Sequence, residues 1–157
     1  MKRRNMFLAL GMGAFCIAVS LFAADDPFNG TWKLNVSKSK FTPGPPPQSG
    51  TITVKVEGDI QNVKTEGQAA DGTMTQTSFV AKLDGTPVPI TGSPTADMTS
   101  LRKINARTLE TKSTKGGKPV AQRRVTISPD GKIMTITGSG LNQKGVKTTA
   151  TAVYEKQ

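Results

Sequence analysis

The sequence predicts an all-β protein, an antiparallel up-and-down β-barrel of about eight to ten strands. Three observations lead to this fold class. Apolar and polar residues alternate in short segments, turn dipeptides recur about every eight to twelve residues, and no segment has a sustained helical period. A sheet with so many strands tends to close, because closure removes the strand edges that invite aggregation. A two-sheet β-sandwich is the alternative, since alternation alone does not separate the two.

The N-terminus has the pattern of a secretory signal peptide. Residues 2–4 are basic, residues 6–24 form an apolar run ending in small residues, and Asp25 begins a polar segment. We expect residues 1–24 to be cleaved and residues 25–157 to form a single barrel domain, secreted or periplasmic. A retained membrane anchor is the alternative, because the run approaches the ~20 residues that cross a bilayer.

The composition lacks the residues of the commonest catalytic and metal sites. The chain has no histidine, and its one cysteine, Cys16, lies inside the signal peptide. A Ser or Cys nucleophile therefore has no His base, and zinc loses its usual ligands. Asp71, Asp84 and Asp130 each precede a glycine, a context typical of turns rather than of a catalytic pair or a calcium loop. We expect no enzyme activity, no metal and no cofactor.

The chain is strongly basic, with 21 Lys and Arg, 11 Asp and Glu and a formal net charge of +10. After the signal peptide these charges are scattered, with no basic run longer than two and little aromatic interleaving. Nucleic acid is therefore not an expected partner. Long-range attraction favours an anionic component of the cell envelope as a partner. No feature of the sequence predicts an oligomeric state.

The expected strands follow one another through short loops. In the first, Trp32, Leu34 and Val36 share an apolar face. The Pro-rich stretch 42–48 cannot join a ladder, because proline has no amide hydrogen. The dipeptides Asp71-Gly72, Asp84-Gly85, Gly116-Gly117 and Asp130-Gly131 suit tight hairpin turns. The expected strand ranges are 32–36, 52–56, 59–66, 73–83, 87–90, 98–104, 108–114, 119–127, 133–138 and 146–155.

Both ends of the chain resemble the calycin superfamily, and distantly the fatty-acid-binding proteins within it. Residues 28–34 (FNGTWKL) are similar to their opening strand, and residues 153–156 (VYEK) to their last strand. In that superfamily a Gly-x-Trp closes the barrel floor, so the resemblance implies a structural role for Trp32 at the base of the barrel.

A fuller resemblance is to secreted bacterial proteins described as lipocalin-like, and it covers nearly the whole mature chain. It rests on residues 30–35 (GTWKLN), 38–44 (KSKFTPG) and 153–157 (VYEKQ). The chain departs from the fatty-acid-binding proteins at two places. Its Pro-rich stretch cannot form their helix-turn-helix lid, and Ala152 replaces the Arg that precedes their last-strand Tyr.

Four residues are candidates for ligand binding: Arg102, Arg123, Arg124 and Tyr154. An acidic ligand in a barrel needs an inward cation. Alternation places Arg102 with Met98 and Ile104, Arg123 with Val125, and Tyr154 with Ala152, whereas the resemblance favours Arg124 over Arg123. The expected function is an exported non-enzymatic barrel that binds an apolar or amphipathic small molecule. The alternative is an envelope structural or interaction protein with a filled barrel and a basic surface.

Overall fold

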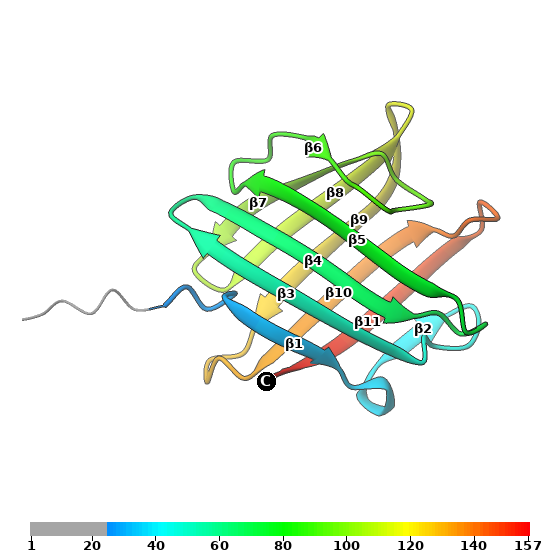
Figure 1. Cartoon of the computed structure of the whole chain (residues 1–157), viewed down its shortest axis with the longest axis horizontal. Helices are drawn as coiled ribbons and strands as arrows, with labels where there is room; N and C mark the ends of the chain where they lie inside the picture. Colours follow the sequence, from blue (N-terminus) through cyan, green and yellow to red (C-terminus); the bar gives the residue numbers. More distant parts are fainter. Residues whose placement is uncertain (1–24) are drawn as a thin grey trace, which may run out of the picture.

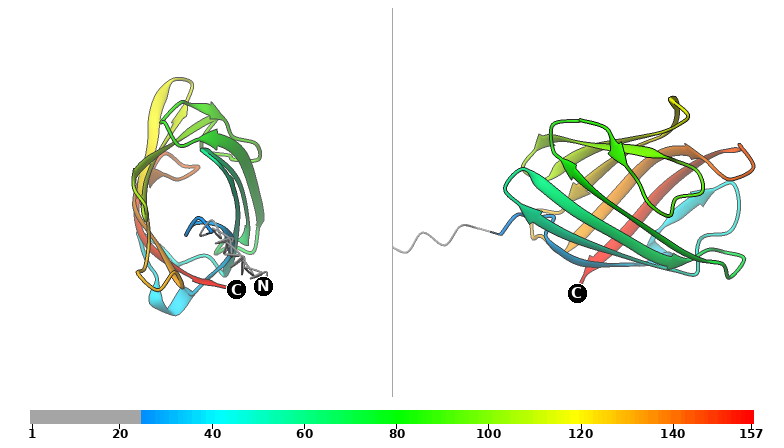
Figure 2. Two further views of the ribbon diagram at one scale, coloured as in Figure 1. Left: turned by 90° about the vertical axis from the view of Figure 1, so that its left-hand side faces the viewer. Right: turned by 45° about the horizontal axis from the view of Figure 1, so that its top comes forward.

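The computed structural model describes residues 25–157, and the predicted signal peptide lies outside the described residues. Within them, one antiparallel sheet of eleven strands curls into a nearly closed barrel, as Figure 1 and the end-on view in Figure 2 show. This confirms the predicted calycin-like up-and-down barrel over the two-sheet sandwich. No helix in residues 25–157 is long and apolar enough to span a membrane.

The strands are β1 (Gly30–Leu34), β2 (Lys40–Thr42), β3 (Ser49–Glu57), β4 (Ile60–Gln68), β5 (Met74–Lys82), β6 (Val88–Pro89), β7 (Met98–Asn105), β8 (Thr108–Lys115), β9 (Lys118–Ile127), β10 (Ile133–Leu141) and β11 (Lys147–Lys156).

Ten strands form a continuous path around the barrel in the order β5-β4-β3-β1-β11-β10-β9-β8-β7-β6, and β2 pairs separately with β11. Isolated bridges join the two ends of this path instead of a full ladder. Ser78 on β5 and Thr91 after β6 exchange backbone hydrogen bonds of 3.1 and 2.9 Å, and the Gly85 N–H donates to the Leu101 carbonyl at 2.7 Å. The dipeptide Asp84-Gly85 therefore contributes to this seam rather than to a hairpin between paired strands.

The chain after β1 differs from the sequence expectation. The first strand ends at Leu34, and a single 3₁₀ turn, η1 (Val36–Lys38), follows it. The Asn35 side chain accepts a hydrogen bond from the Lys38 N–H at 3.1 Å and so caps this turn. Val36 thus leaves the strand. Strand β2, which the sequence did not predict, pairs with residues 149–151 of β11, a part of β11 that does not pair with β1.

Hydrophobic packing concentrates at the end of the barrel that holds the β3–β4 and β9–β10 turns and the chain's described N-terminus (Figure 1). We call this the closed end. Trp32 and Phe28 are 0% and 1% exposed there, and the Trp32 indole N–H donates to the Phe28 carbonyl at 3.0 Å. The other members of this core are Ile52, Val54, Ala81, Leu83, Leu101, Leu109, Val125, Ile127 and Met134.

Turns at the opposite, open end connect β4 to β5, β8 to β9 and β10 to β11. Gly116 and Gly117 join β8 to β9 with φ of 56° and 77°, left-handed backbone angles that only glycine adopts without strain. At the closed end, the Asp130 carboxylate accepts hydrogen bonds from the Ser128 hydroxyl and from the Lys132 N–H, the latter at 3.1 Å. These bonds hold the pKa of Asp130 below its ordinary value, and they give this acid a turn-forming role.

Candidate functional site

The barrel encloses a cavity of about 470 Å³ that extends from the apolar core toward the open end. This volume lies within the range of about 300–1,000 Å³ that is typical of small-molecule sites. An interior filled by side chains, the alternative considered from the sequence, is at odds with this space. The interior of this barrel therefore has room for a ligand.

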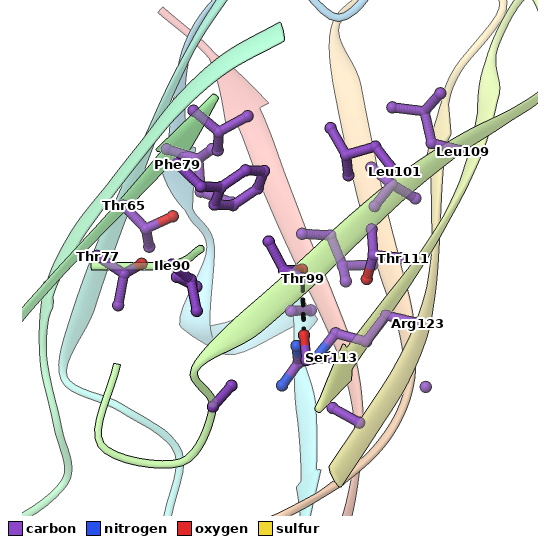
Figure 3. Close-up of a pocket in the computed structure, with 18 of the residues that line it drawn as sticks. Thr65, Thr77, Phe79, Ile90, Thr99, Leu101, Leu109, Thr111, Ser113 and Arg123 are labelled. Carbon is purple, nitrogen blue, oxygen red and sulfur yellow. Dashed lines mark hydrogen bonds between the residues drawn. The ribbon is translucent and has the colours of Figure 1, made fainter. Parts of the chain in front are cut away.

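The cavity wall has two chemical zones. Toward the closed end it is mostly apolar, with Phe79, Leu101 and Leu109 among the residues drawn in Figure 3. Toward the open end, short hydroxyl side chains replace the larger apolar ones. Thr99 and Ser113 hydrogen-bond to each other there at 3.2 Å. The hydroxyl residues that line the cavity are Thr65, Thr77, Ser93, Thr95, Thr99, Thr111, Ser113 and Thr148. Because these side chains are small, they keep this part of the interior open.

Arg123 faces the cavity from the middle of β9. Its Cα partner on β10 is Gly138, where an added Cβ would lie only 3.0 Å from the Arg123 Cγ. A Cβ added at Gly140 would lie 3.5 Å from the Arg123 Nη2. Two inward glycines thus leave room on β10 for the long side chain. Figure 3 shows the guanidinium in the same part of the cavity as Ser113.

Tyr154 faces the same cavity from β11, and its phenol and the Arg123 guanidinium influence each other. Burial lowers the pKa of Arg123, and the nearby Tyr154 opposes this shift. Burial also raises the pKa of Tyr154, and the Arg123 charge opposes that shift. By its accessible surface Arg123 is nevertheless exposed, because it borders the open volume of the cavity rather than the packed core.

The charge of Arg123 is unpaired within the part of the chain that the structure describes. The five ion pairs found in residues 25–157 all involve other basic side chains. A cation enclosed by a barrel loses hydration, and a carboxylate or another anion can compensate for this loss through charge-assisted hydrogen bonds. The cavity is therefore chemically suited to a molecule that is mostly apolar and carries one acidic group.

Arg102 and Arg124 lie on the outside of the barrel, away from this cavity. The Arg102 guanidinium is 57% exposed and pairs with the Glu110 carboxylate, whose pKa it lowers. Arg124 is exposed and has Glu110 as its Cα partner on β8. Leu101 rather than Arg102 faces inward on β7, which corrects the orientation expected for Arg102. On β9 the inward residue is Arg123, which alternation favours, and not Arg124, which the resemblance favours.

Gln61 is a polar cavity residue that the sequence analysis did not select. It is the second residue of β4, only 2% exposed, and lines the cavity near the closed end. The signal was available in the sequence, because Gln61 shares its face of the strand with Val63 and Thr65. A polar residue at the start of an apolar face is a position that needs a hydrogen-bond partner.

Together the topology and the cavity define a calycin-like β-barrel with a hollow interior. No family model and no curated protein matches the chain. Among solved structures, the chain is similar to Rv2717c from M. tuberculosis, with a TM-score of 0.52 and 11% identity over 83% of this chain and 93% of that one. It is also similar to a redesigned β-barrel, with a TM-score of 0.51 and 13% identity over 83% and 92%.

A third similar structure is that of zebrafish ileal bile acid-binding protein complexed with cholic acid. Its TM-score is 0.49, with 12% identity over 83% of this chain and 99% of that one. At these low identities the comparisons bear on the fold alone, and the two structures with TM-scores above 0.5 agree with the barrel predicted from the sequence.

Proposed function

We propose that this protein is an exported, non-enzymatic barrel that binds an amphipathic small molecule with an acidic group inside its cavity. The observation that carries the proposal is the unpaired Arg123 guanidinium on the wall of a cavity of about 470 Å³. Partial loss of hydration lowers the pKa of this guanidinium, and an anion bound beside it in the cavity would offset that loss. A role in ligand binding accounts for an arginine at this position of the cavity wall.

The apolar zone of the cavity supports the same proposal, because it suits the apolar part of an amphipathic ligand. Val63, Phe79 and Ile136 are only partly buried, because they border empty space and not other side chains. A hydrocarbon chain placed against them would remove apolar surface from water, which is favourable by about 25 cal/mol per Å². The acid would then give orientation, and the chain would give most of the affinity.

Calorimetric titration with lauric acid tests this proposal, using Arg123→Gln and the adjacent, outward Arg124→Gln as a matched pair. We expect wild type and Arg124→Gln to bind alike. We expect Arg123→Gln to bind laurate about 10–100-fold more weakly, since a hydrogen bond to a charged group contributes about 1.5–3 kcal/mol. Lauryl alcohol, which has no carboxylate, should bind all three proteins with similar affinity.

Two results would contradict the proposal. In one, wild type takes up neither the acid nor the alcohol. In the other, both arginine variants lower the affinity for laurate equally. The lower affinity would then be due to the overall positive charge of the protein and not to a residue in the cavity.

Export is supported by the basic and apolar order of residues 2–24. We expect the protein recovered from the envelope or medium of a bacterial host to begin at Asp25. Mass spectrometry of the intact chain measures this directly, and a full-length protein confined to the cytoplasm would exclude export.

A further inference from the structure

A second polar group lies unpaired in the cavity, at the end opposite the opening. Gln61 follows the β3–β4 turn at the closed end, and its side-chain Nε2 is buried with no hydrogen-bond partner among the described residues. Buried amide groups almost always have a partner, so an unpaired one calls for an explanation.

The protein around Gln61 does not provide that partner. Its Cα partners on the two neighbouring strands are Val56 on β3 and Ala81 on β5, whose side chains cannot form hydrogen bonds. Gln61 also lines the cavity, so its side chain borders space that a ligand can enter. A ligand that reaches the closed end is therefore in a position to complete the hydrogen bonding of this carboxamide.

Gln61 and Arg123 lie on opposite walls of the barrel. Along the strand path, β4 and β9 are separated by β3, β1, β11 and β10 in one direction and by β5, β6, β7 and β8 in the other. Apolar side chains, among them Val63, Phe79 and Val125, line the cavity that the two residues share. The interior thus has an apolar middle with a cation on one wall and a neutral amide on the other.

We propose that the ligand of this cavity is an amphipathic anion with a second, uncharged polar group, a hydroxyl or a carbonyl, at the end remote from its acid. The acid binds at Arg123 and the second group at the Gln61 carboxamide. This inference rests on the proposed function and specifies its ligand class. A carboxamide both donates and accepts, so it matches a hydroxyl in full and a carbonyl in part. A second charge on the ligand is disfavoured, because Arg123 is the one charged side chain among the described residues that line the cavity.

The test compares lauric acid with ω-hydroxylauric acid, which differ only in a terminal hydroxyl. Each is titrated into wild type, into Gln61→Met, and into Gln76→Met, which alters an exposed glutamine on β5 as a control. We expect the preference for ω-hydroxylaurate over laurate to fall at least about tenfold in Gln61→Met, because the buried hydroxyl then has no partner. The preference in Gln76→Met should equal that of wild type.

The outcomes separate this inference from the proposed function. If both acids bind and the preference is the same in wild type and Gln61→Met, the ligand class is wrong while acid binding stands. If neither acid binds to wild type, both proposals fail. Methionine keeps most of the side-chain volume and removes the unpaired amide, so we expect Gln61→Met to unfold at or above the wild-type temperature.

A second measurement uses wild type alone. In ¹⁵N-resolved NMR, ω-hydroxylaurate should shift the side-chain amide resonance of Gln61 markedly more than laurate does. Equal shifts with the two acids would overturn the inference, whatever the variant shows.

Discussion

Replacing Trp32 with alanine should lower the free energy of unfolding by about 3–5 kcal/mol, the range observed when large buried aromatic side chains are truncated. Trp32 is 0% exposed and packs in the core of the closed end. The Lys156 ammonium lies 5.2 Å from the ring centroid, so the residue also fixes the end of β11 against β1. Truncation would leave a void where β1, β3 and β11 meet.

Far-UV circular dichroism during heating and in urea measures this effect. Trp32 is the one tryptophan of the chain, so fluorescence cannot compare the variants. We expect the melting temperature to fall by roughly 10–20 °C. Trp32→Phe is the control. It keeps an aromatic ring but leaves the Phe28 carbonyl without its indole donor, and should lose only about 1–2 kcal/mol. An alanine variant within about 1 kcal/mol of wild type would show that the closed end does not depend on this residue.

The barrel could be predicted because residue alternation and turn dipeptides are features of short stretches of the sequence. Alternation in residues 119–127 and 146–155 determines which side chains can share a face, and turn dipeptides such as Gly116-Gly117 determine where the chain reverses. The same alternation places Arg123 and Tyr154 inside the barrel, where the structure also has them. Local pattern is sufficient for these strands because each pairs with its neighbour in sequence.

The features that could not be predicted from the sequence depend on contacts between segments that are far apart in the chain. On β7, the apolar residues Met98, Leu101 and Ile104 occupy both faces, so alternation does not decide which face is inside. The register irregularity at Lys103–Asn105 adds to this ambiguity. Arg102 was consequently placed on the wrong face. Strand β2 was also missed, since only its pairing with β11, about 110 residues later in the chain, makes it a strand.

Gln61 shows the limit of sequence analysis for the site itself. Val63 and Thr65, which lie on the same face of β4, indicate that Gln61 points inward. Its lack of a hydrogen-bond partner, however, depends on Val56 and Ala81, which belong to other strands. A cavity with an unpaired cation and an unpaired amide is a property of the closed barrel, and no single segment of the sequence contains it.

Gly138→Ala should combine a large loss of stability with a loss of ligand affinity, because a side chain at this position of β10 would collide with the backbone of β9. A Cβ at this position would lie 2.2 Å from the Gln122 carbonyl oxygen and 2.7 Å from the Arg123 Cα. Both are backbone atoms, so no side-chain rotation relieves the contact and the two strands must separate. We expect a decrease of about 3 kcal/mol in the free energy of unfolding.

The matched control is Gly50→Ala, at a glycine on β3 that β1 and β11 separate from β10 along the sheet. Its added Cβ would lie 3.4 Å from the Leu34 Cβ and 3.6 Å from the Tyr154 hydroxyl, both ordinary contacts that move neither side chain. We expect an unfolding free energy within about 1 kcal/mol of wild type. Urea unfolding followed by circular dichroism measures both variants, and laurate titration at a temperature where both are folded measures their binding. Because the shift at residue 138 displaces Arg123, laurate should bind Gly138→Ala about tenfold more weakly and bind Gly50→Ala as it binds wild type. Normal laurate affinity in a destabilised Gly138→Ala protein would mean that the position of the guanidinium does not govern recognition of the acid.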